Sequence, residues 1–326
     1  MSKRTKVAVV AGGSAGVGRA VVSHLLKEGY DVGILARGKE RLKALEQEYG
    51  ERVACYSCDV GNSDRVARAG ATIEEVLGPI DVWVNAAMLT SFSPFQSMAV
   101  DEFKSIVDTT FIGVVNGTRT ALGLMQARNR GRIVNVGSGL AYRSVPYQSA
   151  YCASKHAING FTAALRSELI RQSSEVTVSL VQLPALNTPQ FDWALNRLSR
   201  RPQPAPPIFD PNVAARAVMR AIDEGKREYF VGRSAIQLIL GNMVLPSWMD
   251  RKLADSGAEM QKSDEEEHGD RPNNLNEPVA DVEPTAHGRF RNQASDKALI
   301  VDADRLRLIA FGALPVLGLL VGLLIG

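Results

Sequence analysis

The chain has 326 residues, a hydrophobic fraction of 45% and a formal net charge of +3 at pH 7. This length accommodates one large α/β domain with additional segments, and the hydrophobic content is sufficient for a sizeable core. The small net charge gives no argument for a nucleic-acid partner, and the three cysteines and four scattered histidines predict neither a disulfide framework nor a metal site.

The first expected element is a short buried strand over residues 6–10, which follows residues 1–4 without a secretory signal. A glycine-rich turn comes next, and a helical pattern covers residues 19–27. Glycines let the backbone approach a pyrophosphate closely, and a helix N-terminus offers free N–H groups and a positive dipole end. A flexible glycine loop is the alternative, but the flanking strand and helix favour a phosphate site. Its expected contacts come from Gly12, Ser14, Gly16, Val17 and Gly18.

Six further strands are expected along the chain, with helical patterns between them. They cover residues 32–35, 53–58, 82–84, 133–136, 176–183 and 229–231. Alternation of this kind predicts a parallel sheet covered by helices on both faces. Right-handed crossovers then give a doubly wound α/β fold of about seven strands, with the cofactor across the carboxyl ends of the strands.

The residues after the second expected strand bear on the choice of cofactor. An enzyme that prefers NAD usually has Asp or Glu here to bind the ribose 2′-hydroxyl. This chain has Ala36 and Arg37 instead. The guanidinium of Arg37 suits a 2′-phosphate, and a solvated surface arginine is the alternative. The sequence therefore favours NADP(H) over NAD(H).

A hydroxyl, a phenol and an ammonium follow the strand expected at residues 132–136. Tyr151 and Lys155 are four residues apart, so on a helix they share a face. A lysine beside a phenol lowers the pKa of the phenol, which can then donate and accept a proton near neutral pH. Ser138 can hydrogen-bond the oxygen that Tyr151 protonates. A Tyr–Lys pair alone also fits a solvated helix surface, but the preceding serine and the glycine turn favour a catalytic set.

Together, the glycine turn and the Ser138, Tyr151 and Lys155 set resemble the short-chain dehydrogenase/reductase family over roughly residues 6–253. The resemblance implies a Rossmann-type fold and hydride transfer between a nicotinamide cofactor and a carbonyl or secondary alcohol. It implies that Tyr151 protonates the developing alkoxide, that Ser138 holds the carbonyl oxygen, and that Lys155 also binds the nicotinamide ribose. Further cofactor contacts are implied for Asp59, Val60, Asn85, Ala86, Pro184 and Thr188.

The chain departs from the family pattern at several positions. Ala11, Ala87 and Ala185 replace the usual Thr, Gly and Gly. Thr110 stands where the family usually has a catalytic Asn that holds a relay water, so the resemblance implies this role for Thr110. These replacements favour an alternative function, a non-catalytic dinucleotide-binding scaffold at a membrane. The intact serine, tyrosine and lysine argue against it.

Two later segments are expected to shape the substrate site. Residues 186–210 correspond to the variable substrate loop of the resembling family. Their apolar side chains either line an apolar pocket or cover the core as a short helix; they are Phe191, Trp193, Leu195 and Leu198. Residues 236–245 form an apolar run too short to span a bilayer. We expect this run to cover the substrate site or to form a subunit contact, which leaves a homo-oligomer open.

The composition changes beyond the expected catalytic domain, residues 1–255. Residues 256–304 are polar, acidic and rich in proline, which predicts a disordered tether. Residues 308–326 carry no charged or polar side chain, and as a helix they span about 28 Å, close to the roughly 30 Å of a hydrocarbon core. A buried helix is the alternative, although the run has no polar face. Because Arg305 and Arg307 precede it, we expect residues 305–326 to be a single-pass anchor in the lipid bilayer with the catalytic domain on the cytoplasmic side.

Overall fold

The computed structural model describes residues 4–269, 271–279 and 285–313. Their central sheet has the strand order β14-β11-β7-β6-β4-β1-β2-β3, and neighbouring strands from β11 to β3 are parallel. The parallel strands are β1 (Val7–Ala11), β2 (Asp31–Ala36), β3 (Val53–Ser57), β4 (Ile80–Asn85), β6 (Gly131–Val136), β7 (Val176–Gln182) and β11 (Glu228–Val231). The predicted parallel sheet is confirmed, and each predicted strand overlaps an observed one.

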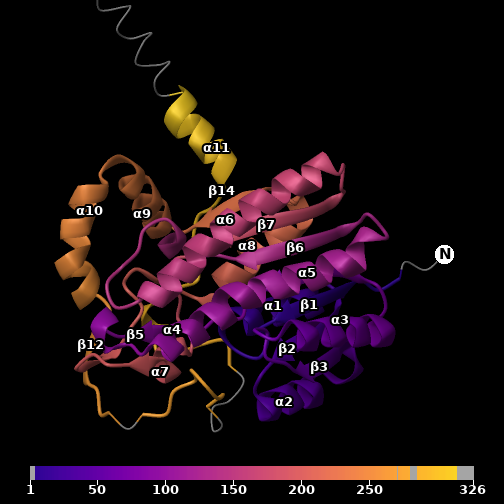
Figure 1. The fold of residues 1–326 in the computed structure, drawn as a ribbon, viewed down its shortest axis with the longest axis horizontal. Helices are drawn as coiled ribbons and strands as arrows, with labels where there is room; N and C mark the ends of the chain where they lie inside the picture. Colours follow the sequence, from indigo (N-terminus) through magenta and orange to yellow (C-terminus); the bar gives the residue numbers. More distant parts are fainter. Residues whose placement is uncertain (1–3, 270, 280–284, 314–326) are drawn as a thin grey trace, which may run out of the picture.

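Helices cover both faces of this sheet (Figure 1). One layer contains α1 (Gly16–Lys27), α2 (Lys39–Tyr49) and α8 (Pro211–Glu224), and the other contains α3 (Ser63–Leu77), α5 (Gly113–Gln126) and α6 (Ser149–Arg171). Successive strand residues point to opposite layers. In β1, Ala8 and Val10 belong to the first core, while Val7 and Val9 belong to the second. This arrangement is the predicted doubly wound fold.

Shorter elements build a cap over the carboxyl ends of the strands. The helices are α4 (Val100–Val107), α7 (Gln190–Trp193), α9 (Arg233–Val244) and α10 (Pro246–Lys252). The strands pair as β5 (Ser91–Phe92) with β8 (Leu195–Asn196), β9 (Arg200–Pro202) with β12 (Lys262–Glu266), and β10 (Ile208–Phe209) with β13 (Ala294–Ser295). A separate apolar cluster, which includes Phe92, Phe191, Leu198 and Phe290, joins the β5, α7 and β10 part of this cap.

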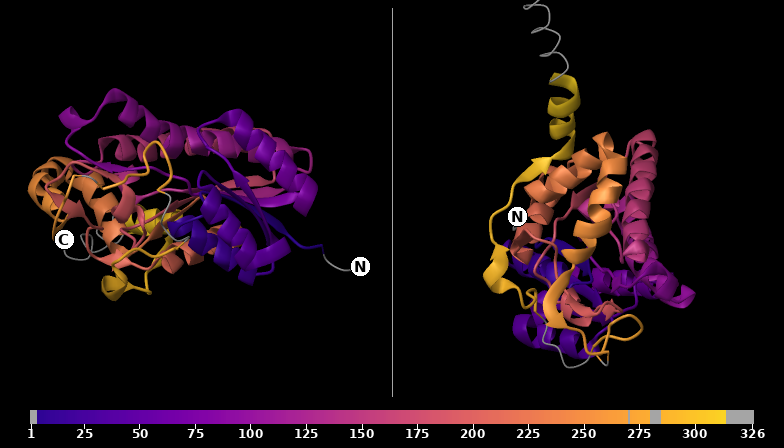
Figure 2. Two further views of the ribbon diagram at one scale, coloured as in Figure 1. Left: turned by 90° about the horizontal axis from the view of Figure 1, so that it is seen from below. Right: turned by 90° about the vertical axis from the view of Figure 1, so that its left-hand side faces the viewer.

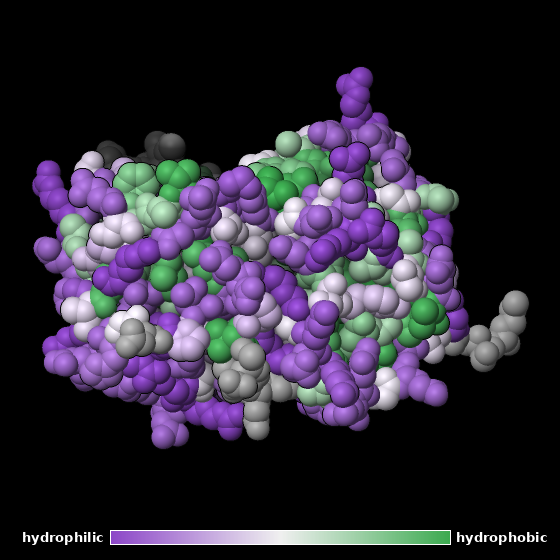
Figure 3. Space-filling view, turned by 60° about the horizontal axis from the view of Figure 1, so that its bottom comes forward, coloured by the Kyte–Doolittle hydropathy of each residue, from purple (hydrophilic) through white to green (hydrophobic). Residues whose placement is uncertain are grey.

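The structure corrects the prediction of a disordered tether over residues 256–304, except at residues 270 and 280–284, which lie outside the described residues. Within this range, β12 pairs with the substrate loop, and β14 (Ile300–Asp302) joins the central sheet antiparallel to β11. Leu275 and Phe290 are buried. A few apolar side chains are enough here because the catalytic domain already supplies the surface on which they pack. The face that carries this segment remains mainly hydrophilic (Figure 3), which explains the disorder-like composition.

Ion pairs account for the acidic character of the same segment. Arg201 of the substrate loop lies 2.6 Å from the Glu265 carboxylate, and Arg227, just before β11, lies 2.6 Å from Asp304. These carboxylates follow the arginines by 64 and 77 residues. No local sequence pattern reports such partners, so the acidic residues resembled a solvated stretch.

The helix α11 (Ala303–Arg307) begins on the domain, where Ala303 is buried, and continues away from it as a π-helical turn, Leu308–Ala313 (Figures 1 and 2). The rest of the predicted anchor, residues 314–326, lies outside the described residues. Across residues 4–269, 271–279 and 285–313, no helix has the length and apolar character needed to cross a membrane.

Candidate active site

The glycine turn lies directly over the carboxyl end of β1. Gly12 has a φ of +85°, and a Cβ at this position would lie 2.6 Å from the backbone nitrogen and Cα of Ala87. A Cβ on Gly18 would lie 2.1 Å from the carbonyl oxygen of Gly12. Only glycine fits at either position, because the turn packs on the loop after β4 and the first turn of α1 packs on the glycine turn. The turn therefore presents backbone rather than side chains to the space above it.

A cavity of about 400 Å³ opens above this turn, at the carboxyl ends of the parallel strands. Its size is in the range of small-molecule sites. Most of the predicted cofactor residues line it, namely Gly12, Ser14, Gly16, Val17, Arg37, Asp59, Val60, Ala86, Pro184 and Thr188. Ser138, Tyr151 and Lys155 line the same cavity. The residues suit a dinucleotide, because the turn lines the cavity with the backbone of Gly12 and Gly16, which lets a pyrophosphate approach closely.

Ser138, Tyr151 and Lys155 come from two adjacent elements. Ser138 follows β6, and its hydroxyl accepts a hydrogen bond of 3.1 Å from the Leu140 N–H. Tyr151 and Lys155 lie one turn apart near the start of α6. The Lys155 ammonium lies 5.5 Å from the centroid of the Tyr151 ring and donates a 2.7 Å hydrogen bond to the Val136 carbonyl. The carboxyl end of β6 thus holds both the serine and the lysine.

Burial dominates the protonation of this set. It lowers the pKa of Lys155 to about 7 and raises the pKa of the Tyr151 phenol above its ordinary value. A hydrogen bond with the Ser138 hydroxyl partly offsets the rise in the Tyr151 pKa. The sequence predicted that Lys155 would lower this pKa. The net shift is in the opposite direction, because desolvation of the phenol outweighs the favourable contacts of its charged form.

Thr110 does not face the cavity. Its hydroxyl donates to the Leu89 carbonyl at 3.0 Å and accepts from the Leu89 N–H at 2.9 Å. The hydroxyl therefore uses its proton and a lone pair within the protein. The side chain is fully buried in the π-helical turn Asp108–Ile112. The predicted relay role is therefore not supported by its position, and Thr110 fixes the loop after β4 instead. Its neighbour Thr109, which the sequence reasoning missed, does line the cavity.

Asn85 and Gly18 are also absent from the cavity lining. The Asn85 amide donates to the Asn135 side chain at 2.8 Å and accepts from the Trp83 indole at 2.9 Å. This buried network joins β4 to β6. The resemblance located Asn85 correctly at the end of the strand. It gave no sign that the Asn85 amide is already hydrogen-bonded to neighbouring polar side chains. Gly18 acts through close packing of α1 on the turn.

The segment after residue 270 crosses the glycine-turn end of the cavity. The Arg37 guanidinium donates to the carbonyl oxygens of Leu275 at 3.2 Å and Asn276 at 3.1 Å, and also to that of Asn274. Arg41 donates to the Val279 carbonyl at 2.9 Å, and the Gly16 N–H donates to the Thr285 carbonyl at 3.0 Å. The sequence reasoning missed this contact, because carbonyl acceptors leave no residue-type signal.

The substrate loop combines both roles that the sequence left open. Phe191 and Trp193 line the cavity, whereas Leu195 and Leu198 do not. Leu198 instead belongs to the apolar cluster of the cap. Further lining residues that the sequence did not indicate are Gln148, Met260 and Gln261, and the Gln148 amide donates to the Gln261 side chain at 2.6 Å. The predicted cover over residues 236–245 is α9, which contributes Ala235 and Leu238 to the lining.

Fold and site together define an oxidoreductase with a nicotinamide-dinucleotide cleft. Residues 6–196 match the family model described as short chain dehydrogenase. The chain is 30% identical over 282 residues to an uncharacterized oxidoreductase, YxnA, of Bacillus subtilis (strain 168), which covers 85% of this chain and 78% of that protein. The chain therefore belongs to the short-chain dehydrogenase/reductase family and acts on a carbonyl or alcohol.

Further comparisons also give reductases and a dehydrogenase. The 3-oxoacyl-(acyl-carrier-protein) reductase of Bos taurus is 35% identical over 173 residues, or 53% of this chain and 73% of that protein. A solved short-chain dehydrogenase from Streptomyces avermitilis has a TM-score of 0.66 at 26% identity, over 78% of this chain and 99% of the other. A variant of actinorhodin polyketide ketoreductase with NADPH has a TM-score of 0.60 at 30% identity, over 68% and 91%.

Proposed function

We propose that the chain is an NADP(H)-dependent oxidoreductase that transfers a hydride between nicotinamide and an apolar carbonyl compound or secondary alcohol at a membrane surface. One observation carries the proposal: Ser138, Tyr151 and Lys155 line the same cavity as the glycine turn. A dinucleotide held by the turn and a substrate beside the phenol would share this space. A non-catalytic scaffold has no need of all three side chains.

The protein supplies position and protons, and the bound cofactor supplies the hydride. In the reductive direction, Tyr151 donates its phenolic proton to the developing alkoxide. Ser138 hydrogen-bonds the same oxygen, which stabilises the charge that develops there. Lys155, buried beneath the Tyr151 ring and held by the Val136 carbonyl, supplies a nearby positive charge when protonated. In the oxidative direction, the phenolate form of Tyr151 accepts the proton from the alcohol.

Preference for NADP(H) is supported by two guanidinium groups at the glycine-turn end. Arg37 and Arg41 both line the cavity, and no carboxylate stands directly after β2. Burial lowers the pKa of both groups, and the positive charge of Arg37 lowers the pKa of Arg41 further. A 2′-phosphate placed between them would relieve this repulsion and take charge-assisted hydrogen bonds in place of some of the backbone carbonyl oxygens to which both groups donate.

Fluorescence titration of NADPH and NADH tests this preference. We expect NADPH to bind more tightly than NADH. We expect Arg37→Ala and Arg41→Ala each to lower the affinity for NADPH by about ten- to a hundredfold, with little effect on the affinity for NADH. Arg171→Ala, at the exposed end of α6, is the charge-matched control and should bind both cofactors like the wild type. Equal affinities of the wild type for NADPH and NADH would refute the preference.

An apolar substrate is supported by large apolar side chains in the lining of the cavity. They are Leu140, Phe191, Trp193, Leu238, Leu253 and Met260. The direct experiment incubates the protein with NADPH that carries deuterium at the transferable position and with ketones of increasing apolar size. We expect deuterium at the carbinol carbon, with kcat/KM rising with apolar area. Lack of any transfer across the panel would favour the scaffold instead.

Membrane attachment is supported by apolar residues at one end of the molecule. Leu308, Ile309 and Phe311 are exposed beyond α11 and begin the apolar run of residues 308–326. The α9–α10 junction, which exposes Val244 and Trp248, turns at the same end of the molecule (Figures 1 and 2). This arrangement suits a bilayer anchor with the catalytic domain beside the cytoplasmic leaflet, and an apolar substrate supplied from the lipid.

Cell fractionation tests the attachment. We expect the full chain to sediment with membranes and to resist extraction by alkaline carbonate. Salt screens charges and high pH removes positive charge, so both release proteins that are held only by electrostatic attraction. A chain shortened after Arg307 keeps β14 and α11 and should enter the soluble fraction with its cofactor affinity intact. Recovery of the full chain in the soluble fraction without detergent would contradict the anchor.

A further inference from the structure

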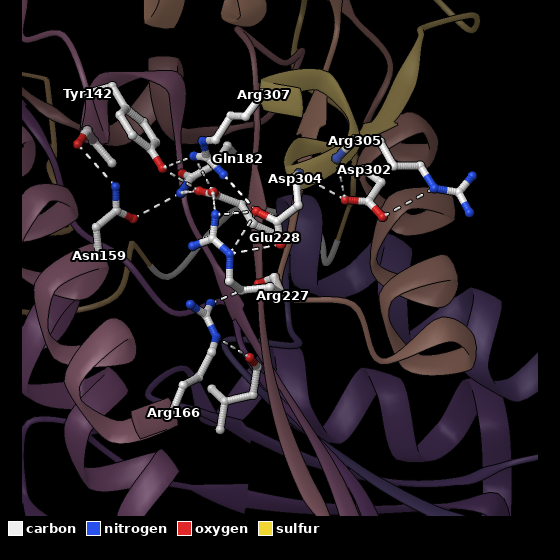
Figure 4. A network of polar contacts seen from close by, with 12 residues as sticks. Tyr142, Asn159, Arg166, Gln182, Arg227, Glu228, Asp302, Asp304, Arg305 and Arg307 are labelled. Carbon is white, nitrogen blue, oxygen red and sulfur yellow. Dashed lines mark hydrogen bonds and ion pairs between the residues drawn. The ribbon is translucent and has the colours of Figure 1, made fainter. Parts of the chain in front are cut away.

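Glu228, the first residue of β11, is a carboxylate with no solvent exposure at the centre of a polar network (Figure 4). The Tyr142 hydroxyl donates to its Oε1 at 2.6 Å, and the Gln182 amide donates to the same oxygen at 2.8 Å. Arg307 donates to its Oε2 at 2.7 Å. Arg227 is more distant, at 3.4 Å. Arg307 is therefore the main partner that compensates the buried charge.

The network reaches the catalytic turn through Gln182, the last residue of β7. The Gln182 amide nitrogen is committed to Glu228 and to the Asn159 side chain at 2.9 Å. These contacts orient the amide so that its oxygen accepts a 2.8 Å hydrogen bond from the Ser138 N–H. A Cβ on Gly137 would lie 2.2 Å from this same oxygen, so the backbone before Ser138 packs directly on the Gln182 amide. Glu228 thus sets the amide orientation that holds the Ser138 backbone.

The other end of the network lies on α11, far from Ser138 in the sequence. Arg307 also donates to the Tyr142 hydroxyl at 3.0 Å and pairs with Asp304 at 3.2 Å. Tyr142 lies just after the turn that carries Ser138, so the arginine contacts both branches of the network. Within the described residues, these contacts connect α11 to the domain together with the pairing of β14 with β11, the ion pair of Arg227 with Asp304 and the buried Ala303.

We propose that Glu228 is a positioning residue that couples docking of α11 to the catalytic turn, so that Arg307 on α11 helps to place Ser138. The coupling acts through the oriented Gln182 amide. It concerns the serine, tyrosine and lysine chemistry of the family and therefore rests on the proposed function. When Arg307 is removed, the Glu228 carboxylate loses its nearest positive charge and draws its remaining donors, including the Gln182 amide, into new positions.

The first experiment measures amide hydrogen exchange over residues 137–145 in the full chain, which requires no turnover. We expect Arg307→Ala to raise exchange of this segment at least tenfold. Arg305→Ala is the matched control on the same helix, because Arg305 is exposed and its side chain pairs with Asp302 at 3.9 Å, at the edge of the network in Figure 4, and not with Glu228. Its exchange should equal that of the wild type. Equal exchange in the two variants would overturn the proposal, whatever the activity of the protein.

The second experiment compares steady-state kinetics on a carbonyl that the wild type reduces. We expect Arg307→Ala to lower kcat about tenfold while the KM for the cofactor changes less than twofold, and Arg307→Lys to restore part of kcat. The rise of alcohol oxidation with pH should move to higher pH, because a displaced Ser138 no longer lowers the pKa of Tyr151. The other groups at this phenol, Cys152 and Lys155, are unchanged. A uniform loss of kcat with an unchanged pH profile would contradict the coupling.

A double-mutant cycle connects the two ends of the network, since no hydrogen bond or ion pair of the described residues joins Arg307 to Gln182 directly. Gln182→Met keeps the shape of the side chain but cannot accept from the Ser138 N–H at the same geometry. If Arg307 and Gln182 act on Ser138 through one path, the double variant Arg307→Ala/Gln182→Met should lose no more kcat than Gln182→Met alone. Additive losses would overturn the proposal. Should Arg307→Ala fail to fold, Glu228→Gln replaces it in the cycle, with the same expected result.

Discussion

Leu275 offers the sharpest test of how the segment after residue 255 is attached. Its side chain is only 3% exposed and packs in a cluster with Leu89, Ile106, Ala150 and Tyr151. Leu275→Ala removes about three methylene equivalents, or about 2.4 kcal/mol at ~0.8 kcal/mol each. Leucine-to-alanine changes in cores cost about 2–5 kcal/mol in total. We place this one near 2.5 kcal/mol, because the backbone around Leu275 can relax into the space.

The loss should appear as a larger fraction of molecules with this segment undocked. At about 1.4 kcal/mol per tenfold change, 2.5 kcal/mol corresponds to roughly a sixtyfold rise. Limited trypsin digestion at Arg289, which is followed by Phe290, reports that fraction when opening and closing are faster than cleavage. Leu299→Ala, in the same segment but 51% exposed, is the control and should change the rate by no more than about threefold. Equal cleavage of both variants would refute the docking.

Two further predictions concern the cavity. Gly18→Ala should abolish detectable NADPH binding, because its Cβ would lie 2.1 Å from the Gly12 carbonyl oxygen. Gly160→Ala is the control: nothing lies within 4 Å of its Cβ, so this variant should bind NADPH normally and gain up to about 1 kcal/mol of stability. Equal NADPH binding by the two variants would contradict the packing argument. Burial lowers the pKa of Lys155 to about 7 from an ordinary 10.5, so the unfolded chain binds more protons between these values. The free energy of unfolding of the cofactor-free protein should therefore rise with pH from about 7 to about 10.5, and Lys155→Met, followed by urea denaturation, should remove that rise.

The sheet and the catalytic set were predictable because their signals are local. Short apolar runs at regular intervals specify buried parallel strands, and the glycine turn and the Tyr151–Lys155 pair need only their own spacing. The same local patterns place Gly12 and Ser138 at strand ends, where a parallel sheet brings them to one edge.

What the sequence did not reveal depends on partners far along the chain. Arg37 donates to carbonyl oxygens 237 to 239 residues later, and carbonyls are present at every residue, so no pattern marks them. Motif position located Asn85 and Thr110 correctly, but their hydrogen-bond partners decide that both hold structure rather than face the cavity. Leu275 is one apolar residue in a polar segment, and its burial follows from the cluster that receives it.

The central claim is that Tyr151 transfers the proton during hydride transfer in the cavity shared with the glycine turn. The most direct measurement is the rate of NADPH oxidation with a reducible ketone, beside the NADPH dissociation constant, in the wild type and in Tyr151→Phe. Positioned acid–base groups contribute about a hundred- to ten-thousandfold. We therefore expect kcat to fall at least a hundredfold while NADPH affinity stays within about threefold. Turnover by Tyr151→Phe at a rate comparable to that of the wild type would contradict the account.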